Sequence, residues 1–155
     1  MFDAAFVGHV KALLEIEGAT CACLANMDAS VDDDLRKSRF FIDRTTTPDS
    51  YQLLLRGTNP GVGWIYDIDR FGCSSEASEW CMYCERSSEI AIIAFRCDVS
   101  LERYVPVIKS FKAVHIAEAL KQQLAYGFSS QALAAAWRSE LLAEYASRSQ
   151  SLSGA

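Results

Sequence analysis

The chain has 155 residues, and 15 Lys and Arg against 20 Asp and Glu give it a net charge of −5. Hydrophobic residues make up 50% of the chain and charged residues 23%, which is typical of a folded globular domain and excludes intrinsic disorder. The length fits one domain. A net negative chain lacks the clustered Lys and Arg that bind phosphate backbones, so we expect no nucleic-acid partner.

The N-terminal segment has neither a basic region nor an unbroken apolar core, so it does not have the pattern of a signal peptide. No stretch approaches the roughly 18–20 consecutive apolar residues of a membrane helix, and we expect no membrane partner. We therefore predict a cytoplasmic protein. In that compartment thiols stay reduced, which is the state expected for all 6 cysteines, namely Cys21, Cys23, Cys73, Cys81, Cys84 and Cys97.

The first third of the chain predicts two helices. Apolar residues at helical spacing indicate a helix over 4–17, with Asp3 as its N-cap and Gly18 following its last turn. Residues 20–25 are apolar and short, and fit either a strand or a helix. A capping-box pattern that begins at Ser30 predicts a short helix over 30–39.

The middle of the chain predicts a sheet, with strands at 39–44, 51–56 and 63–70. In the third of these, Trp64, Tyr66 and Ile68 alternate with Ile65, Asp67 and Asp69, as in a strand with one apolar face. Segments 79–86 and 89–96 are joined by a short Ser-Ser connection, which indicates an antiparallel hairpin. Because residues 90–95 are apolar on both faces, we expect them to form a central strand.

The last third predicts helices. One is expected over 111–126, ending at Gly127, and a second follows Ser129 or Ser130 with an apolar stripe that includes Trp137 and Tyr145. Together the patterns predict a single α+β domain over residues 1–146. It has an N-terminal helix, a central antiparallel sheet of four to five strands and a C-terminal helical hairpin, and a flexible tail covers 147–155.

Cys81 and Cys84 stand in a Trp-Cys-x-x-Cys motif, which is typical of thioredoxin-like redox sites. Such a site needs a helix after the motif, whereas here another strand follows. In a strand, residues three apart project to opposite faces and lie about 10 Å apart, too far for a disulfide. A zinc site that includes Cys21 and Cys23 would have an unusual Cys-x-Cys spacing. We interpret the cysteines as core residues, and keep a thiol-dependent redox or zinc-binding protein centred on residues 81–84 as the alternative.

The sequence shows no catalytic constellation. His9 and His115 fall in predicted helices, and neither a nucleophile elbow nor a His-Glu-x-x-His pair is present. Gly61-Val-Gly63 lacks the third glycine of a dinucleotide loop. We therefore expect no catalytic residue, no metal ligand and no cofactor, and we favour a protein without enzymatic activity.

Acidic residues gather around the predicted strand ends and a predicted loop over 71–78. They are either a solvated rim or a negative surface that attracts a basic partner and speeds association. These residues are Asp67, Asp69, Glu76, Glu79, Glu85 and Glu89.

In size, acidity and the aromatic-rich segments 63–67 and 79–85, the chain resembles bacterial immunity proteins, which neutralise a cognate toxin by covering its active site. The resemblance implies a non-enzymatic protein that masks the active site of a toxin or effector domain with a basic cleft. A homo-oligomer joined through the C-terminal hairpin is a further alternative. The residues expected to bind the partner are Asp67, Asp69, Glu76, Glu79, Trp64, Tyr66 and Trp80.

Overall fold

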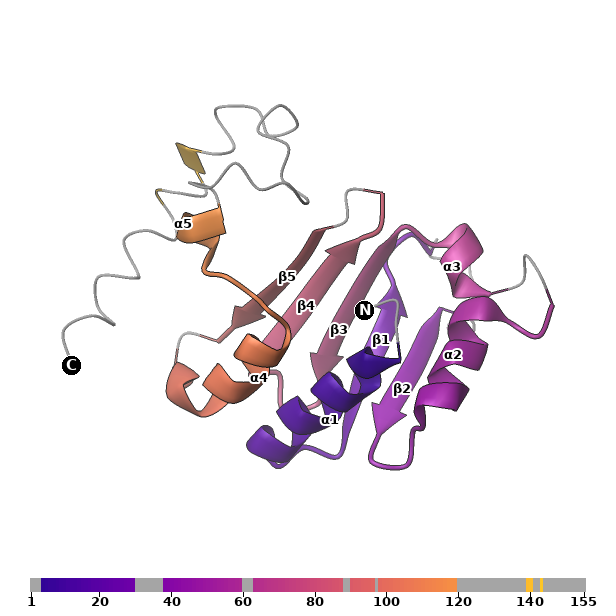
Figure 1. Ribbon diagram of the computed structural model, residues 1–155, viewed down its shortest axis with the longest axis horizontal. Coiled ribbons are helices and arrows are strands. Elements are labelled where there is room, and N and C mark those ends of the chain that lie inside the picture. Colours follow the sequence, from indigo (N-terminus) through magenta and orange to yellow (C-terminus); the bar gives the residue numbers. More distant parts are fainter. Residues whose placement is uncertain are drawn as a thin grey trace.

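The computed structural model describes residues 4–29, 38–59, 63–87, 90–96, 98–119, 139–140 and 143. A five-stranded antiparallel sheet has the order β2-β1-β3-β4-β5 (Figure 1). Its strands are β1 (Cys21–Asn26), β2 (Arg39–Asp43), β3 (Arg70–Ser75), β4 (Trp80–Glu85) and β5 (Ile90–Phe95). The helices are α1 (Ala5–Glu17), α2 (Pro48–Arg56), α3 (Trp64–Asp67), the 3-10 turn η1 (Leu101–Tyr104), α4 (Val105–Ser110) and α5 (Ile116–Ala119). The α+β class, the antiparallel sheet and the N-terminal helix are confirmed.

Strand β1 lies between β2 and β3 and is antiparallel to both, so β2 and β3 run in the same direction. The connection between them passes through α2 and α3 and crosses over β1. Strands β3, β4 and β5 then follow as an antiparallel meander, which includes the predicted hairpin of β4 and β5. This topology leaves β2 and β5 at the two edges of the sheet.

Helices α1, α2 and α4 lie on the same side of the sheet (Figure 1). Their apolar side chains meet the residues of the strands that point toward them, such as Leu24, Phe71 and Trp80, each at most 1% exposed. Each such fully buried large side chain stabilises the fold by about 1.5–3 kcal/mol. The core is therefore one layer between the helices and a single face of the sheet.

Local sequence signals explain where the first two helices begin and end. Gly18 adopts φ 73°, and its amide donates to the carbonyls of the last turn of α1, as a C-terminal glycine does. Helix α1 follows Ala4, whose side chain makes no capping hydrogen bond, and the predicted N-cap Asp3 lies outside the described residues. At α2, Thr47 and Ser50 form a reciprocal capping box, with Pro48 in the first turn.

The predicted strand over 51–56 is wrong, because these residues belong to α2. Tyr51 and Leu55, four residues apart, are buried, whereas Leu53 between them is 55% exposed. This is helical spacing. The preceding Thr-Thr-Thr-Pro-Asp-Ser segment contains the cap of this helix.

The predicted strand over 63–70 is also wrong. Residues 64–67 form α3, and the strand β3 occupies most of the segment predicted as a loop. A Cβ atom on Gly63 would lie 2.2 Å from the backbone carbon of Arg56, so only glycine allows this close contact with the end of α2. In β3, Gly72 and Ser74 alternate with buried Phe71 and Cys73, and such small residues hid the strand pattern.

The last two corrections concern β5 and the C-terminal region. Strand β5 lies at the edge of the sheet rather than at its centre. The predicted helix over 111–126 does not begin at residue 111. Lys112 adopts a left-handed conformation with φ 55°, which separates α4 from α5. Residues 120–138 and most of 139–155 lie outside the described residues, so the helical hairpin and the tail stay predictions. Of the predicted helix over 30–39, residues 30–37 also lie outside them, and Arg39 belongs to β2.

Candidate functional site

Every second residue of the strands points away from the helices, and together these residues form what we call the open face. Among the described residues, no helix covers it. Its large apolar members Phe41, Tyr83 and Ile92 are 59%, 36% and 38% exposed. By strand order and register, the open face contains Arg39, Phe41 and Asp43 of β2, Cys21, Cys23 and Ala25 of β1, Arg70, Gly72 and Ser74 of β3, Cys81, Tyr83 and Glu85 of β4, and Ile92 and Ala94 of β5.

The open face has small side chains along its middle and larger ones on both sides. Apart from Arg70 at one end, strands β1 and β3 contribute only Cys, Ala, Gly and Ser, between Phe41 on one side and Tyr83 on the other. The side chain of Met27 lies over Gly72, at one end of this middle strip: its Sδ is 3.0 Å from the position that a Cβ atom on Gly72 would occupy. Met27 is 53% exposed. An exposed apolar area of this kind is typical of surfaces that bind another molecule.

One end of the open face carries two carboxylates, Asp43 and Glu76, on either side of Cys21. Glu76 accepts hydrogen bonds from the amide and hydroxyl of Thr20, at 2.6 and 2.7 Å. Asp43 accepts from the amide and hydroxyl of Thr45, at 2.8 and 2.7 Å. These bonds lower the pKa of both carboxyls, so both stay charged at neutral pH. Since the donors are neutral, this acidic end keeps its negative charge.

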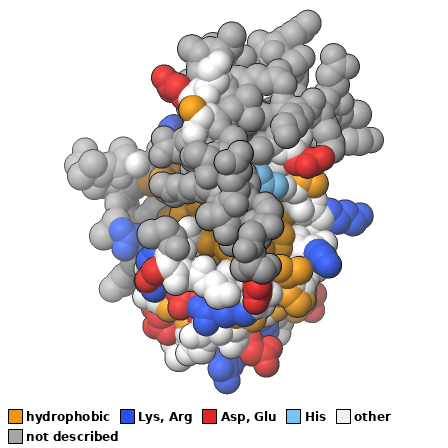
Figure 2. Space-filling model, turned by 90° about the vertical axis from the view of Figure 1, so that its left-hand side faces the viewer, with side chains coloured by type: hydrophobic (Ala, Val, Ile, Leu, Met, Phe, Trp, Pro, Cys, Tyr) orange, Lys and Arg blue, Asp and Glu red, His pale blue; other side chains and the backbone are white. Residues whose placement is uncertain are grey.

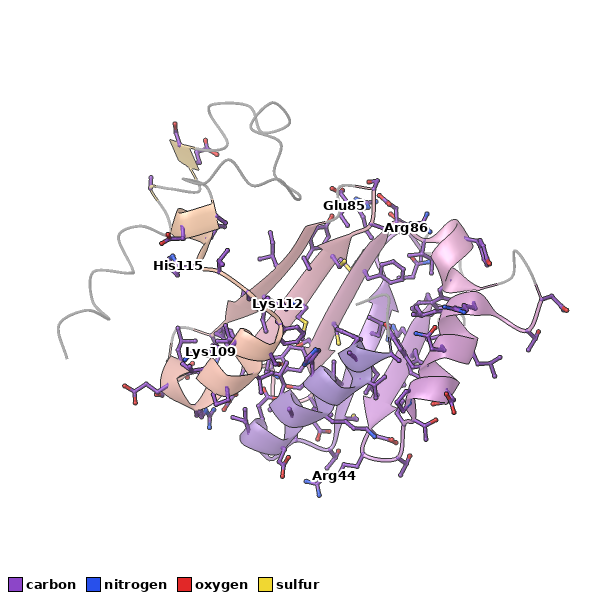
Figure 3. The ribbon with its side chains drawn as sticks, in the orientation of Figure 1. Arg44, Glu85, Arg86, Lys109, Lys112 and His115 are labelled. Atoms are coloured by element: carbon purple, nitrogen blue, oxygen red, sulfur yellow. The ribbon has the colours of Figure 1, made fainter. Side chains whose placement is uncertain are left out.

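The opposite end of the sheet has mixed charges. Asp28 forms an ion pair with Arg70 at 2.6 Å and also accepts two backbone amides, and the amide of Arg70 is the main cause of its lowered pKa. Asp69 accepts from the amide and hydroxyl of Ser87, both at 2.8 Å. Figure 3 places Glu85 and Arg86 at this same end. Because acidic and basic side chains lie close together here, this end of the sheet would repel part of any strongly charged partner surface, whether that surface is negative or positive.

The structure separates the acidic residues that the sequence grouped together. Asp69 and Glu76 flank opposite ends of β3, whose six residues span about 20 Å. The side chain of Asp67 lies outside the described part. The prediction that these acidic residues cluster around a loop over 71–78 is therefore wrong, because most of the segment between Asp69 and Glu76 is an extended strand.

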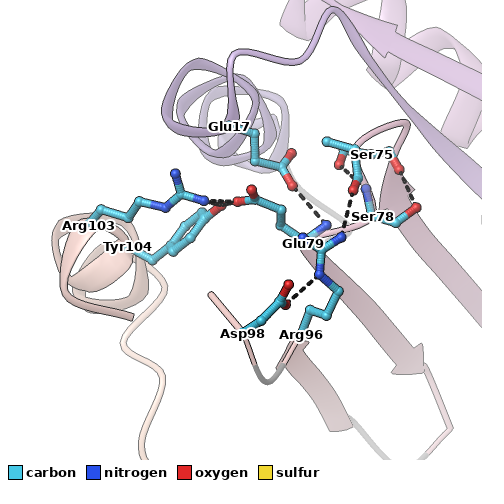
Figure 4. Close-up of polar contacts among 9 residues, drawn as sticks. Glu17, Ser75, Ser78, Glu79, Arg96, Asp98, Arg103 and Tyr104 are labelled. Atoms are coloured by element: carbon cyan, nitrogen blue, oxygen red, sulfur yellow. Dashed lines mark hydrogen bonds and ion pairs between the residues drawn. The ribbon is translucent and has the colours of Figure 1, made fainter. Parts of the chain in front are cut away.

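Glu79 links the sheet to the helical layer through both its side chain and its backbone (Figure 4). Its carboxylate accepts a hydrogen bond from the hydroxyl of Tyr104 and forms an ion pair with Arg103, which compensates its charge. The bond from Tyr104 is the main cause of its lowered pKa. Its backbone amide donates to Glu17 at 3.1 Å, so Glu79 connects β4 to both α1 and η1.

The three predicted aromatic anchors lie in different environments. Trp80 is 1% exposed, because the alternation of β4 points it with Met82 and Cys84 into the core, so its assignment as a partner contact is wrong. Trp64 is half-buried and stacks on Phe71 with 6.2 Å between ring centroids. Tyr66 is 53% exposed but belongs to α3, away from the open face.

The two thiols of the Cys-x-x-Cys motif point to opposite faces, as the sequence predicted. Cys81 is exposed on the open face, and Cys84 is buried in the core. Burial raises the pKa of Cys84, Cys73 and Cys23, which keeps these thiols protonated. In the described ranges, no group of three or more His, Cys, Asp or Glu residues could hold a metal ion.

One Ser–His contact was not foreseen from the sequence. Ser110 Oγ lies 2.9 Å from His9 Nδ1, between α4 and α1. However, the hydroxyl donates to the carbonyl of Val107 at 2.7 Å, and the His9 ring packs on Phe111 with centroids 4.5 Å apart. The serine hydroxyl therefore has a hydrogen-bond acceptor within its own helix, and its contact with His9 joins α4 to α1.

Comparison with protein-family models, with curated proteins and with solved structures gives no significant match. The resemblance to immunity proteins therefore stays a prediction. No helix in the described part of the chain has the length and apolar character needed to cross a membrane.

Sequence reasoning missed Phe41 as a candidate binding residue, although the pattern of β2 contained a signal for it. Phe40 and Ile42 alternate with Phe41, so the sequence shows an aromatic residue on each face of that strand. The period-two pattern does not say which face the helices cover, and this information comes only from the packing of α1, α2 and α4.

Proposed function

We propose that the protein is a non-enzymatic binding protein that neutralises a partner protein, a toxin or effector domain, by covering the partner's active site. The observation that supports this proposal most is the open face, which leaves Phe41, Tyr83 and Ile92 exposed on one side of the sheet. Exposed aromatic side chains around a strip of small residues suit a protein interface, where a few aromatic anchors contribute most of the binding free energy.

The charges favour a partner with a basic cleft. Asp43 and Glu76 hold two negative charges at one end of the open face, and the whole chain has a net charge of −5. The apolar strip would bury surface area, while the acidic end would accept a Lys or Arg of the partner. Long-range attraction would also speed the encounter, since complementary charges raise association rates.

The thiol alternative receives no support from the geometry. A redox dithiol or an activated thiol needs a lowered pKa and a nearby partner sulfur. Here Cys81 and Cys84 lie on opposite faces, and burial raises the pKa of Cys84. We therefore do not propose a thiol-dependent activity.

The proposal is tested with the products of the two genes that flank the gene for this chain. Each product is expressed in cells alone and together with the protein, and growth is measured. We expect one product to be toxic, and we expect co-expression to restore growth. With purified proteins, inhibition should reach completion at one equivalent and produce no turnover of either chain.

Paired variants locate the interface. Phe41→Asp together with Tyr83→Asp should abolish protection, because both charges would enter the apolar contact. The matched control is Tyr66→Asp, because Tyr66 is an aromatic residue that is 53% exposed but belongs to α3 and not to a strand of the open face, and this variant should protect as well as the wild type. If neither flanking product is toxic, or if protection survives the open-face pair, the proposed neutralising role is wrong.

A further inference from the structure

The two edges of the sheet differ in how they are closed. Strand β2 carries Arg39 and Asp43 at its ends. The outward amide of Asp43 donates to Thr46 Oγ1 at 3.0 Å, and its carbonyl accepts the amide of Thr46 at 3.3 Å. Charges and side chains of this kind prevent edge strands from pairing with other chains. The β2 edge is therefore protected.

Among the described residues, strand β5 has none of these protections. Its sequence, Ile-Ala-Ile-Ile-Ala-Phe, contains no charged residue, no proline and no glycine. Figure 2 views the molecule from the side where β5 lies, and the Lys, Arg, Asp and Glu side chains gather mostly in its lower part. A long apolar edge strand is a template for pairing with another strand.

The direction of the free backbone groups of β5 follows from its pairing with β4. The amide of Arg96 donates to the carbonyl of Glu79 at 2.8 Å, which marks these two residues as a hydrogen-bonded pair. Because such pairs alternate along an antiparallel ladder, Ile92 and Ala94 also bond to β4. The N–H and C=O groups of the remaining residues therefore point outward, and none bonds to another described residue. They are those of Ala91, Ile93 and Phe95.

We propose that β5 pairs with β5 of a second copy of this chain, antiparallel and about a two-fold axis at Ile93. In this register Ile93 of one chain lies opposite Ile93 of the other, and Ala91 of each chain lies opposite Phe95 of the other. The outward groups then form on the order of six hydrogen bonds. A two-fold interface must be complementary to itself, and this register satisfies that condition.

The side chains of β5 favour a second copy over an unrelated strand. On the helix side, small Ala91 would lie opposite large Phe95, and on the open face Ala94 would lie opposite Ile92. No charge would face a like charge, although each chain has a net charge of −5. The two-fold axis would be perpendicular to the sheet, so both open faces would lie on the same side of one continuous sheet.

The test is the mass of the full chain in solution, measured by light scattering over a range of protein concentrations. The wild type should reach twice the mass of one chain. Ala91→Pro removes an outward amide and leaves the bonds to β4, so it should weaken the dimer by about 30-fold or more. Ile92→Lys should also give a monomer. The matched control Phe41→Lys changes the other edge of the same face and should remain dimeric.

Amide hydrogen exchange of the wild type gives a second readout that needs no variant. The amides of Ala91, Ile93 and Phe95 should be protected at high concentration and lose protection on dilution, whereas Ile92 and Ala94 should stay protected. A wild type that is monomeric at every concentration contradicts the proposal, as does a dimer that persists unchanged in both Ala91→Pro and Ile92→Lys. Concentration-independent protection of Ala91, Ile93 and Phe95 would also contradict it.

Discussion

The two faces of the sheet come from the same strands but meet different surroundings. On the covered face, the side chains of β4 are Trp80, Met82 and Cys84, all buried, whereas Cys81 and Tyr83 of the same strand are exposed on the open face. The alternation of a strand thus divides one short segment between core and surface. Neighbouring residues of similar type, such as Trp80 and Tyr83, therefore have different roles, and only the covered face stabilises the fold strongly.

The largest expected effect contrasts these two aromatic residues. Trp80→Ala removes a side chain that is 1% exposed and leaves a cavity, which should lower the free energy of unfolding by about 3–5 kcal/mol. Tyr83→Ala, on the open face, should change it by less than about 1 kcal/mol. Urea unfolding followed by circular dichroism measures both. Equal losses in the two variants would mean that the open face is packed against something, and the contrast between the faces would fail.

A smaller effect is expected from the Glu79 carboxylate, which connects the sheet to the helical layer. Its pKa in the folded protein lies below the ordinary value of 4.5, chiefly because of the hydrogen bond from Tyr104. The stabilisation is therefore complete above the unfolded pKa and is lost as the pH falls through the folded pKa. We expect Glu79→Gln to be less stable than the wild type at pH 7, with the difference disappearing in acid.

Urea midpoints measured across that pH range check this prediction. Glu102→Gln removes an exposed carboxylate next to Arg103 and serves as the matched control. If the control and Glu79→Gln show the same dependence on pH, then the contacts of Glu79 do not connect the two layers energetically.

The elements that were predicted correctly are those whose residue pattern indicates a helix or a strand without information from the rest of the chain. The helix over 4–17 has apolar residues at helical spacing, and the hairpin of β4 and β5 is two short apolar segments with a brief connection; both are confirmed. The segment 48–56 was misassigned because a capping box at Thr47 resembles a turn when it precedes a short apolar run. Strand β3 was missed because Gly72 and Ser74 interrupt the alternation that normally reveals a strand.

The candidate site was harder to predict than the fold class, because it depends on long-range packing. Nothing local distinguishes Trp80, which faces the helices, from Phe41, which does not. Likewise, the apolar sequence of β5 correctly indicated a strand but not its position, since an apolar edge strand and a central strand have the same composition. The acidic residues appeared to be clustered only because β3, which separates Asp69 from Glu76, was interpreted as a loop.

The most direct test of the contrast between the faces is residue-by-residue alkylation of the thiols in the folded protein, followed by mass spectrometry. Cys81, which is exposed on the open face, should react first, and half-buried Cys21 and Cys23 more slowly. Cys73 and Cys84, on the covered face, should react only when the protein unfolds, because both are buried and their thiol pKa values are raised. Modification of Cys84 as fast as that of Cys81 would contradict the division of the sheet into a covered face and an open face.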